Sequence, residues 1–160
     1  MDRLWAPWRM NYIKAKKQKG CLFCKANRQK AAGEKYYVIF KSRHSIAMLN
    51  SFPYNNGHLM VSPLRHVSKL TQLNENESLD LLCSIDRAIR LLDKVLKPQG
   101  YNIGINISRS AGAGITGHLH MHIVPRWPGD TNFMPALYDT RVIPESLDEL
   151  YRQLKAKNNE

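Results

Sequence analysis

The chain has 160 residues, of which 43% are hydrophobic and 23% charged, a balance typical of one globular domain with its own core. No apolar run approaches the roughly 20 residues of a membrane-spanning helix, and the opening residues lack the apolar stretch of a secretory signal, so we expect a cytoplasmic protein without a membrane partner. The formal net charge of +11 favours an anionic substrate or partner, either a small polyphosphate or nucleic acid.

Residues 1–20 are predicted to form an N-terminal extension. The first thirteen hold two tryptophans, a proline and a tyrosine, which is too aromatic for a disordered tail. We expect this extension to pack on the domain or on a second subunit. No internal repeat, linker or second domain is visible, so residues 1–160 are expected to form a single domain.

Cys21 and Cys24 form a Cys-x-x-Cys pair, which alone is ambiguous between a redox motif and half of a zinc site. The pair follows a lysine-rich segment and not a strand, which does not favour a redox motif of the thioredoxin kind. His66 and His118 can supply the two further ligands of a closed, tetrahedral zinc site. Two free thiols that pack remain the alternative. Cys83 stands alone and is expected to be a small buried residue.

Short apolar or alternating runs bounded by turn residues predict strands at 36–40, 45–49, 58–62, 101–107 and 118–124. Between them, Asn74 and Glu77 have the spacing of a helix-capping box. Apolar residues then recur every three or four positions, which predicts an amphipathic helix of about six turns. Its predicted core positions are Leu79, Leu82, Ile85, Ile89, Leu92 and Leu96. The C-terminal segment, 136–160, is expected to contain a second helix that starts at Pro144.

Three histidines, His118, His120 and His122, alternate with apolar residues in the last predicted strand. Alternation at period two places them on one face of a strand, with the apolar residues directed to the core. Three imidazoles in a row are costly unless each finds a partner. A polar strand face is one explanation; a site that handles phosphate or a metal is the alternative that this regular spacing favours.

Glycines and a further histidine lie near this strand in the predicted fold. Residues 108–117 hold three glycines directly before His118, where backbone N–H groups can approach an anion closely. A plain connector is the alternative for this loop. His58 follows Gly57 and opens an apolar strand; it is either a hydrogen-bonded core histidine or part of the same site.

The segment His118-Leu-His-Met-His-Ile-Val resembles the His-φ-His-φ-His-φ-φ signature of the histidine triad superfamily, where φ is apolar. The Trp-x-Pro-Trp-Arg-Met opening and the Cys-x-x-Cys pair are similar to a zinc-containing bacterial branch related to diadenosine tetraphosphate phosphorylase and hydrolase. Together, pattern and resemblance imply an α+β fold with a mainly antiparallel sheet of about five strands flanked by helices. The resemblance also implies a homodimer.

The resemblance implies a role for each histidine of the motif. His120 would be the nucleophile, His122 would contact phosphate and assist the leaving group, and His58 would help to orient the nucleophile. The first triad histidine would join the structural zinc site described above. The implied nucleotide-binding residues are Asn50, Asn106, Gly112, Gly114, Thr116 and His122. Asn50 stands where relatives commonly have an aspartate that binds ribose, and Ile115 stands where many have glutamine.

The implied activity is cleavage of a dinucleoside polyphosphate at its α-phosphate through a covalent nucleotidyl-histidine intermediate, with no cofactor beyond structural zinc. Phosphorolysis and hydrolysis both remain open, as do the base preference and the length of the polyphosphate. One alternative is another superfamily enzyme, either a nucleoside phosphoramidate hydrolase or a processor of adenylylated nucleic-acid ends. The other is a non-enzymatic, zinc-stabilised nucleotide-binding module.

Overall fold

The computed structural model describes residues 20–29, 36–130 and 143–159. The predicted N-terminal extension, 1–20, therefore lies outside the described residues except for Gly20. In chain order the strands and α-helices are α2 (Leu22–Arg28), β1 (Val38–Lys41), β2 (Ser45–Leu49), β3 (Leu59–Pro63), α3 (Glu75–Leu96), β4 (Gly100–Gly104), β5 (Met121–Arg126) and α5 (Leu147–Asn158). Two single-turn 3₁₀ helices, η2 (Leu70–Gln72) and η3 (Arg109–Ala111), lie between them.

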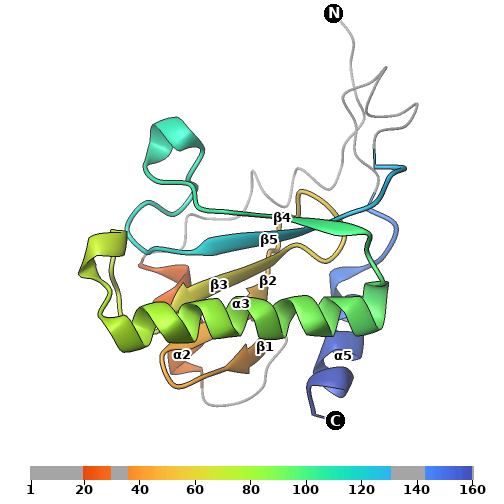
Figure 1. Ribbon diagram of the computed structural model, residues 1–160, viewed down its shortest axis with the longest axis horizontal. Coiled ribbons are helices and arrows are strands. Elements are labelled where there is room, and N and C mark those ends of the chain that lie inside the picture. Colours follow the sequence, from red (N-terminus) through yellow and green to blue (C-terminus); the bar gives the residue numbers. More distant parts are fainter. Residues whose placement is uncertain (1–19, 30–35, 131–142, 160) are drawn as a thin grey trace, which may run out of the picture.

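The strands form one five-stranded sheet in the order β1-β2-β3-β5-β4, with every neighbouring pair antiparallel. Figure 1 shows α3 lying across one face of this sheet, with α2 on the far side. The α+β, antiparallel fold predicted from the sequence is thereby confirmed. Among the described residues, no helix combines the length and the apolar character needed to cross a membrane.

Strict alternation along β2 divides the core into two clusters. Ala47 and Leu49 pack with residues of α3 and α5, whereas Ile46 and Met48 pack with Phe23 of α2. Side chains on a strand alternate between the two faces, so a single strand supplies both clusters. The sheet is therefore buried on both sides along its centre, and each face has its own helical cover.

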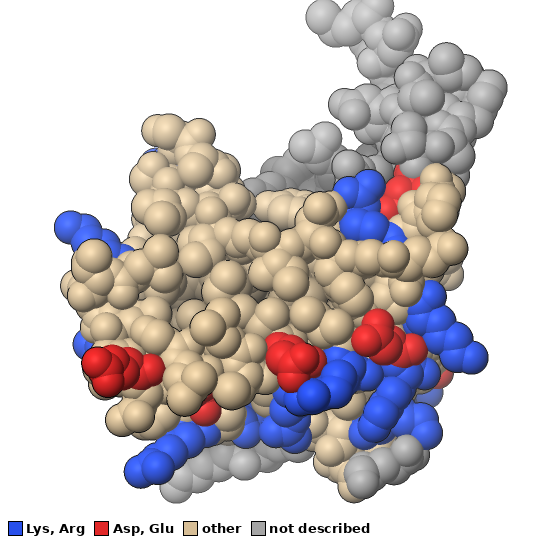
Figure 2. Space-filling model, in the orientation of Figure 1, with Lys and Arg blue, Asp and Glu red and all other residues tan. Residues whose placement is uncertain are grey.

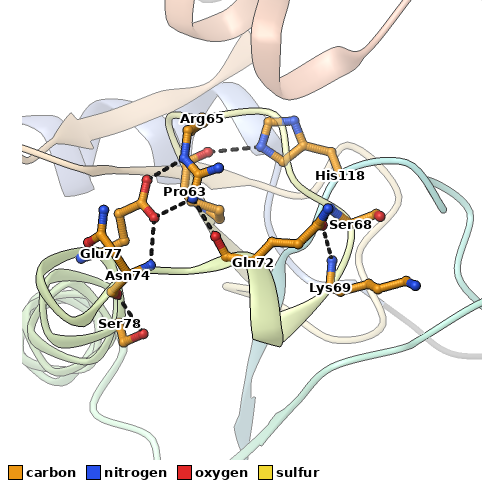
Figure 3. Close-up of polar contacts among 9 residues, drawn as sticks. All are labelled: Pro63, Arg65, Ser68, Lys69, Gln72, Asn74, Glu77, Ser78 and His118. Atoms are coloured by element: carbon orange, nitrogen blue, oxygen red, sulfur yellow. Dashed lines mark hydrogen bonds and ion pairs between the residues drawn. The ribbon is translucent and has the colours of Figure 1, made fainter.

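The start of α3 is fixed by the capping box that the sequence predicts. The Asn74 side chain accepts from the Glu77 N–H at 2.9 Å, and the Glu77 carboxylate accepts from the Asn74 N–H at 3.0 Å. The same carboxylate forms a two-pronged ion pair with Arg65, at 2.8 and 2.7 Å (Figure 3). This pair holds the pKa of Glu77 down to about 2, chiefly through the hydrogen bond from Arg65. The segment that follows β3 is thus tied to the first turn of α3.

Asn74→Ala is expected to destabilise the protein by about 1 kcal/mol, because the Glu77 N–H loses its acceptor. For a chain of this size that corresponds to a fall in Tm of about 2 to 4 °C in thermal unfolding. The matched control is Asn76→Ala, an exposed position in the first turn of the same helix. Equal effects of the two substitutions would contradict the capping role.

The predicted buried face of α3 is partly wrong. Leu79 and Leu82 are 63% and 62% exposed. The buried positions are Glu77, Leu81, Ser84, Ile85, Ala88, Leu91 and Leu92. Leucines stand at both 81 and 82, so spacings of three and four fit two faces of the helix equally well, and packing on the sheet decides between them. Cys83 is also exposed, contrary to the prediction that it is buried.

Several predicted boundaries shift, and the strand predicted at 36–40 begins only at Val38. β4 ends at Gly104, so Asn106 follows the strand, and α5 begins after Ser146, whose hydroxyl accepts from the Glu149 N–H, and not at Pro144. β5 begins only at Met121, which pairs with Val61 of β3, and the Leu119 N–H donates to the Val67 carbonyl instead of to β3. Side chains take over there: Ser62 Oγ donates to the Leu119 carbonyl at 2.9 Å.

Candidate active site and metal centre

Four buried histidines line the face of the sheet that α2 covers: His58, His118, His120 and His122. His122 lies on β5 beside Met60 of β3, and the other triad members sit in the extended segment just before β5. The His120 and His122 rings meet edge to face, with their centroids 4.9 Å apart. Leu119 and Ile123 are buried, Ile123 in the cluster at α3, as the alternation predicts.

His58 reaches this cluster because Gly57 permits a tight turn. Gly57 has a φ of +75°, and a Cβ built there would lie 2.5 Å from Leu96 Cδ1 and 3.1 Å from Pro125 Cγ. Only glycine combines this backbone conformation with so close an approach to α3 and β5. The Gly-His pair seen in the sequence therefore turns the chain into β3 with the imidazole buried against His122.

The hydrogen bonds fix which nitrogen of each ring carries the proton. The Tyr54 backbone N–H can only donate, and it lies 3.0 Å from His58 Nδ1, so that nitrogen accepts. Neutral His58 then carries its proton on Nε2, which donates to His122 Nδ1 at 2.9 Å. His122 in turn carries its proton on Nε2. That buried atom has no hydrogen-bond partner among the described residues, and it is ready to donate to an incoming oxygen.

His120 has the opposite tautomer. Its Nδ1 lies 2.8 Å from the His118 backbone carbonyl, which can only accept, so the proton sits on Nδ1. The lone pair is therefore on Nε2, and no described residue forms a hydrogen bond to that atom. A neutral imidazole with a free, unprotonated Nε2 is chemically a nucleophile.

All three site histidines are held neutral by their surroundings. Burial, with a smaller contribution from neighbouring imidazoles, lowers the pKa of His58 to about 3 and that of His122 to about 4. Burial also lowers the pKa of His120. At neutral pH the nucleophile candidate is thus unprotonated, and His122 donates as a neutral ring.

Stability is expected to fall as the pH drops from about 6.5 towards 4.5. In this window the unfolded chain protonates His58 and His122 at the ordinary histidine pKa, whereas the folded protein keeps both neutral. The unfolded state then binds about two more protons, and the free energy of unfolding decreases by up to about 2.7 kcal/mol per pH unit. Urea unfolding at pH 7.5, 6.0 and 5.0 measures the slope. A pH-independent free energy over this range would contradict the assignment.

A cluster of Cys21, Cys24, His66 and His118 brings four ligand atoms within 4.8 Å of one another. Three Sγ–Nδ1 separations within the cluster are 3.1, 3.4 and 3.7 Å, and the two histidine Nδ1 atoms lie 3.2 Å apart. A tetrahedral zinc ion with Zn–S of about 2.3 Å and Zn–N of about 2.0 Å needs ligand atoms about 3.3 to 3.8 Å apart. The donor set and its spacing fit zinc.

The His118 ring is oriented for this role by its other nitrogen. Its Nε2–H donates to the Pro63 carbonyl at 2.8 Å (Figure 3), which leaves the Nδ1 lone pair directed at the cluster. A metal-binding histidine commonly has such a partner on the nitrogen that faces away from the metal. The two cysteines lie at the start of α2, so the four residues predicted for a zinc site are brought together.

The predicted nucleotide-binding residues are less closely gathered. Asn50 Nδ2 lies 3.3 Å from His58 Nδ1, and its Oδ1 accepts from the Phe52 N–H. Asn106 lies beside Gly112, since a Cβ at that glycine would be 3.9 Å from Asn106 Nδ2, and Gly112 adopts a φ of +87° that favours glycine. Gly114 and Thr116 are exposed, and no hydrogen bond between described residues joins them to the histidines.

Sequence reasoning missed two aromatic contacts. The Tyr54 ring lies 4.6 Å from that of His58 and 5.7 Å from that of His122, and Phe23 contacts the His118 and His120 rings. Tyr54 stands in a turn segment whose Pro, Asn and Gly signal only a loop. Phe23 carries a usable signal, because an apolar residue between two metal ligands on a short helix is expected to face the core.

Comparisons with known proteins agree with this geometry. A family model described as the HIT domain matches residues 33–129. The AP-4-A phosphorylase of Mycobacterium tuberculosis (strain ATCC 25618 / H37Rv) is 38% identical over 161 residues, which covers 96% of this chain and 83% of the relative. The asymmetrical bis(5'-nucleosyl)-tetraphosphatase of Schizosaccharomyces pombe is 34% identical over 93 residues, or 58% of this chain and 50% of that protein.

Among solved structures, a Zn-bound histidine triad family protein from Mycobacterium smegmatis superimposes with a TM-score of 0.69 at 27% identity. The match covers 88% of this chain and 94% of that one. Fold, motif and sequence similarity thus agree over most of the chain, which is a member of the histidine triad family of nucleotide-processing hydrolases and transferases.

Proposed function

We propose that this protein cleaves dinucleoside polyphosphates at the α-phosphate through a covalent intermediate on His120. The observation that carries the proposal is the pair of complementary tautomers: His120 offers a lone pair on Nε2, while the adjacent His122 offers an unpartnered N–H on Nε2. One ring can attack phosphorus while its neighbour donates to a phosphate oxygen. The substrate class rests on the two relatives named above.

In the first step, the His120 Nε2 lone pair forms a bond to the α-phosphorus, and the bond from phosphorus to the bridging oxygen breaks. The polyphosphate leaves with that electron pair, and His122 donates a hydrogen bond to the developing charge. The Nδ1–H of the nucleotidyl-imidazolium continues to donate its hydrogen bond to the His118 carbonyl. Water or inorganic phosphate then attacks phosphorus, and the P–N electron pair returns to His120.

The nucleotide is proposed to lie between the histidines and the loop that precedes them. Asn106 and Gly112, which are neighbours, would contact phosphate together with Gly114 and Thr116, and Asn50 would contact the ribose. Glycine positions in such a loop leave backbone N–H groups accessible to an anion. The excess of basic residues in the chain supports attraction of a polyanion of this kind.

Zinc is proposed to be a structural ion held by the two cysteines at the start of α2 and by His66 and His118. It would join the start of α2 to the segment that follows β3 and to the segment that precedes β5, and it has no place in the chemical steps. Free thiols at Cys21 and Cys24 suit the reducing cytoplasm, where such ligands stay available to a metal.

The proposal is tested by incubating the purified protein with diadenosine tetraphosphate, with and without inorganic phosphate, and separating the products by chromatography. ADP and ATP formed only with phosphate indicate a phosphorylase, and AMP and ATP formed without phosphate indicate a hydrolase that attacks the α-phosphate. Two ADP would mean attack at a β-phosphorus and would contradict the proposed α-phosphate mechanism. An acid-labile, base-stable labelled adduct on the protein, absent in His120→Ala, supports the intermediate. Cleavage of an adenosine phosphoramidate alone would instead support the phosphoramidate hydrolase, and no reaction with either would support the binding module.

A homodimer through the β4 edge of the sheet is also proposed. β4 is an edge strand, and its outer backbone groups have no strand partner among the described residues. Four of the seven large apolar side chains exposed in the described part of the chain lie on α3, on β4 or just after it: Leu79, Leu82, Ile103 and Ile107. Figure 2 shows few charged side chains over β4 and the adjacent sheet, with Lys and Arg gathered along the lower edge of this face.

Pairing of β4 with its own copy would bury these apolar side chains by a two-fold, self-complementary contact. Light scattering coupled to size exclusion should give about twice the monomer mass, and Ile103→Lys should shift the protein towards monomer. The matched control is Phe52→Lys, which adds the same charge at a similarly exposed apolar residue in the loop between β2 and β3. A wild-type monomer at micromolar concentration would overturn the dimer.

A further inference from the structure

Phe23 connects the metal cluster to the proposed nucleophile. It stands between Cys21 and Cys24 in the first turn of α2, and its side chain is completely buried. Its ring centroid lies 5.2 Å from that of His118 and 5.0 Å from that of His120, with interplanar angles of 52° and 36°. Because the ring has no exposed surface, it contacts the His120 imidazole from the protein interior and not from the substrate side.

A second connection runs through His118. Its side chain belongs to the metal cluster through Nδ1 and is anchored by the Pro63 carbonyl at Nε2. Its backbone carbonyl is the acceptor that keeps the proton of His120 on Nδ1, at 2.8 Å. The same residue is therefore a metal-ligand candidate through its side chain and the partner of the nucleophile through its backbone. It precedes β5, so the sheet ladder does not hold it in place.

We propose that the cluster of Cys21, Cys24, His66 and His118, when it holds a metal, positions the proposed nucleophile: the metal fixes α2 and His118, and Phe23 with the His118 carbonyl then fixes the ring plane and tautomer of His120. Phe23 is a positioning residue that acts through His120. In a neutral histidine, the hydrogen-bond partners of the two ring nitrogens determine which nitrogen carries the proton. The inference deepens the proposed function, since it explains how the Nε2 lone pair is kept available.

The contacts that join the metal cluster to His120 can be broken separately. Loss of the metal releases both α2 and the His118 ring, loss of the Phe23 ring removes only the contact from the interior, and neither change removes the His120 side chain. After either change the His120 imidazole is still present and still buried. However, it no longer has a single tautomer and a single ring orientation. A misplaced nucleophile lowers turnover far more than substrate binding.

The test compares Phe23→Leu with Phe40→Leu in zinc-loaded protein. Phe40 is buried, 5% exposed, in the cluster on the opposite face of the sheet, and no ring contact among the described residues joins it to a histidine, so it controls for loss of a buried ring. The first readout is the imidazole nitrogen chemical shifts of His120 at one fixed neutral pH, which report the tautomer without any substrate. The second is the separation of kcat from KM.

In Phe23→Leu with one zinc per chain, the His120 shifts should move from a single Nδ1–H tautomer towards a mixture. Its kcat should fall about 10- to 100-fold, with KM within about threefold of the wild-type value. Phe40→Leu should keep the wild-type shifts and a kcat within about twofold, whatever its loss of stability. Wild-type shifts in Phe23→Leu, or equal losses of kcat in both variants, would overturn the proposal.

Two further experiments test the proposal if Phe23→Leu does not fold. Phe23→Met places a flexible, unbranched apolar chain where the flat ring was, and is expected to show the same change in the His120 shifts. Stepwise chelation of zinc from wild-type protein should move these shifts in proportion to the metal removed, with reversal when zinc is restored. His120 nitrogen chemical shifts that do not change with zinc occupancy would overturn the proposal. Because no substrate is present, a change in these shifts in a protein that leaves diadenosine tetraphosphate intact would reject the proposed function and not this inference.

Discussion

His120→Ala is expected to lower kcat for dinucleoside polyphosphate cleavage by at least about 10⁴-fold, because no other group can take over a lost covalent nucleophile. His122 cannot substitute, since its Nδ1 accepts from His58 and its Nε2 carries a proton. Steady-state kinetics with chromatographic product analysis measures the loss. Nucleotide binding, followed by calorimetry, should persist, because the groups that would hold the phosphates are unchanged.

The matched control for this substitution is His44→Ala. It removes an imidazole from the turn between β1 and β2, and the His44 side chain forms no hydrogen bond among the described residues. We expect its kcat to remain within about twofold of wild type, since surface changes away from special features have small effects. Turnover by His120→Ala within tenfold of the wild-type rate would reject the covalent mechanism and favour direct attack by water.

Cys24→Ser is expected to abolish stoichiometric zinc binding and to lower the free energy of unfolding by at least about 3 kcal/mol. Binding to a structural zinc site contributes directly to folding free energy, and a serine hydroxyl does not replace a thiolate ligand. For a chain of this size the expected fall in Tm is about 6 to 12 °C. Elemental analysis gives the metal content, and differential scanning calorimetry gives the Tm.

Cys83→Ser makes the same chemical change at an exposed cysteine of α3 that lies outside the cluster. It should retain one zinc per chain and the wild-type Tm within about 1 °C. A chelator should lower the Tm of wild type and Cys83→Ser alike and leave that of Cys24→Ser unchanged. Full zinc content in Cys24→Ser would show that the four residues are not the ligand set.

Much of the site could be predicted because it depends on local spacing. Period-two alternation on one strand is sufficient to place His120 and His122 on a common face, whatever the rest of the fold is. A Cys-x-x-Cys pair positions two thiols on one turn of a helix, so only the two histidine ligands had to come from elsewhere. Asn74 and Glu77 likewise act within one turn, and their capping box is present as predicted.

The errors occur where two local solutions are equally good. For α3, Leu81 and Leu82 offer alternative apolar stripes, and only the sheet beneath the helix selects the one that includes Leu81. For the triad segment, alternation continues back to His118, but the ladder with β3 stops at the Val61–Met121 pair, and the Leu119 N–H donates to the Val67 carbonyl instead. Boundaries of this kind depend on the partner strand and not on the segment's own residues.

The sequence by itself determined which reactive groups this protein carries, namely a row of imidazoles, a pair of thiols and the glycines that precede the row. Only the tertiary structure decided the proton on each ring, because that proton is set by partners from other segments. The Tyr54 N–H fixes His58 and through it His122, and the His118 carbonyl fixes His120. A residue's identity limits what it can do, whereas the donor or acceptor placed against it by the fold determines which of its two nitrogens is reactive.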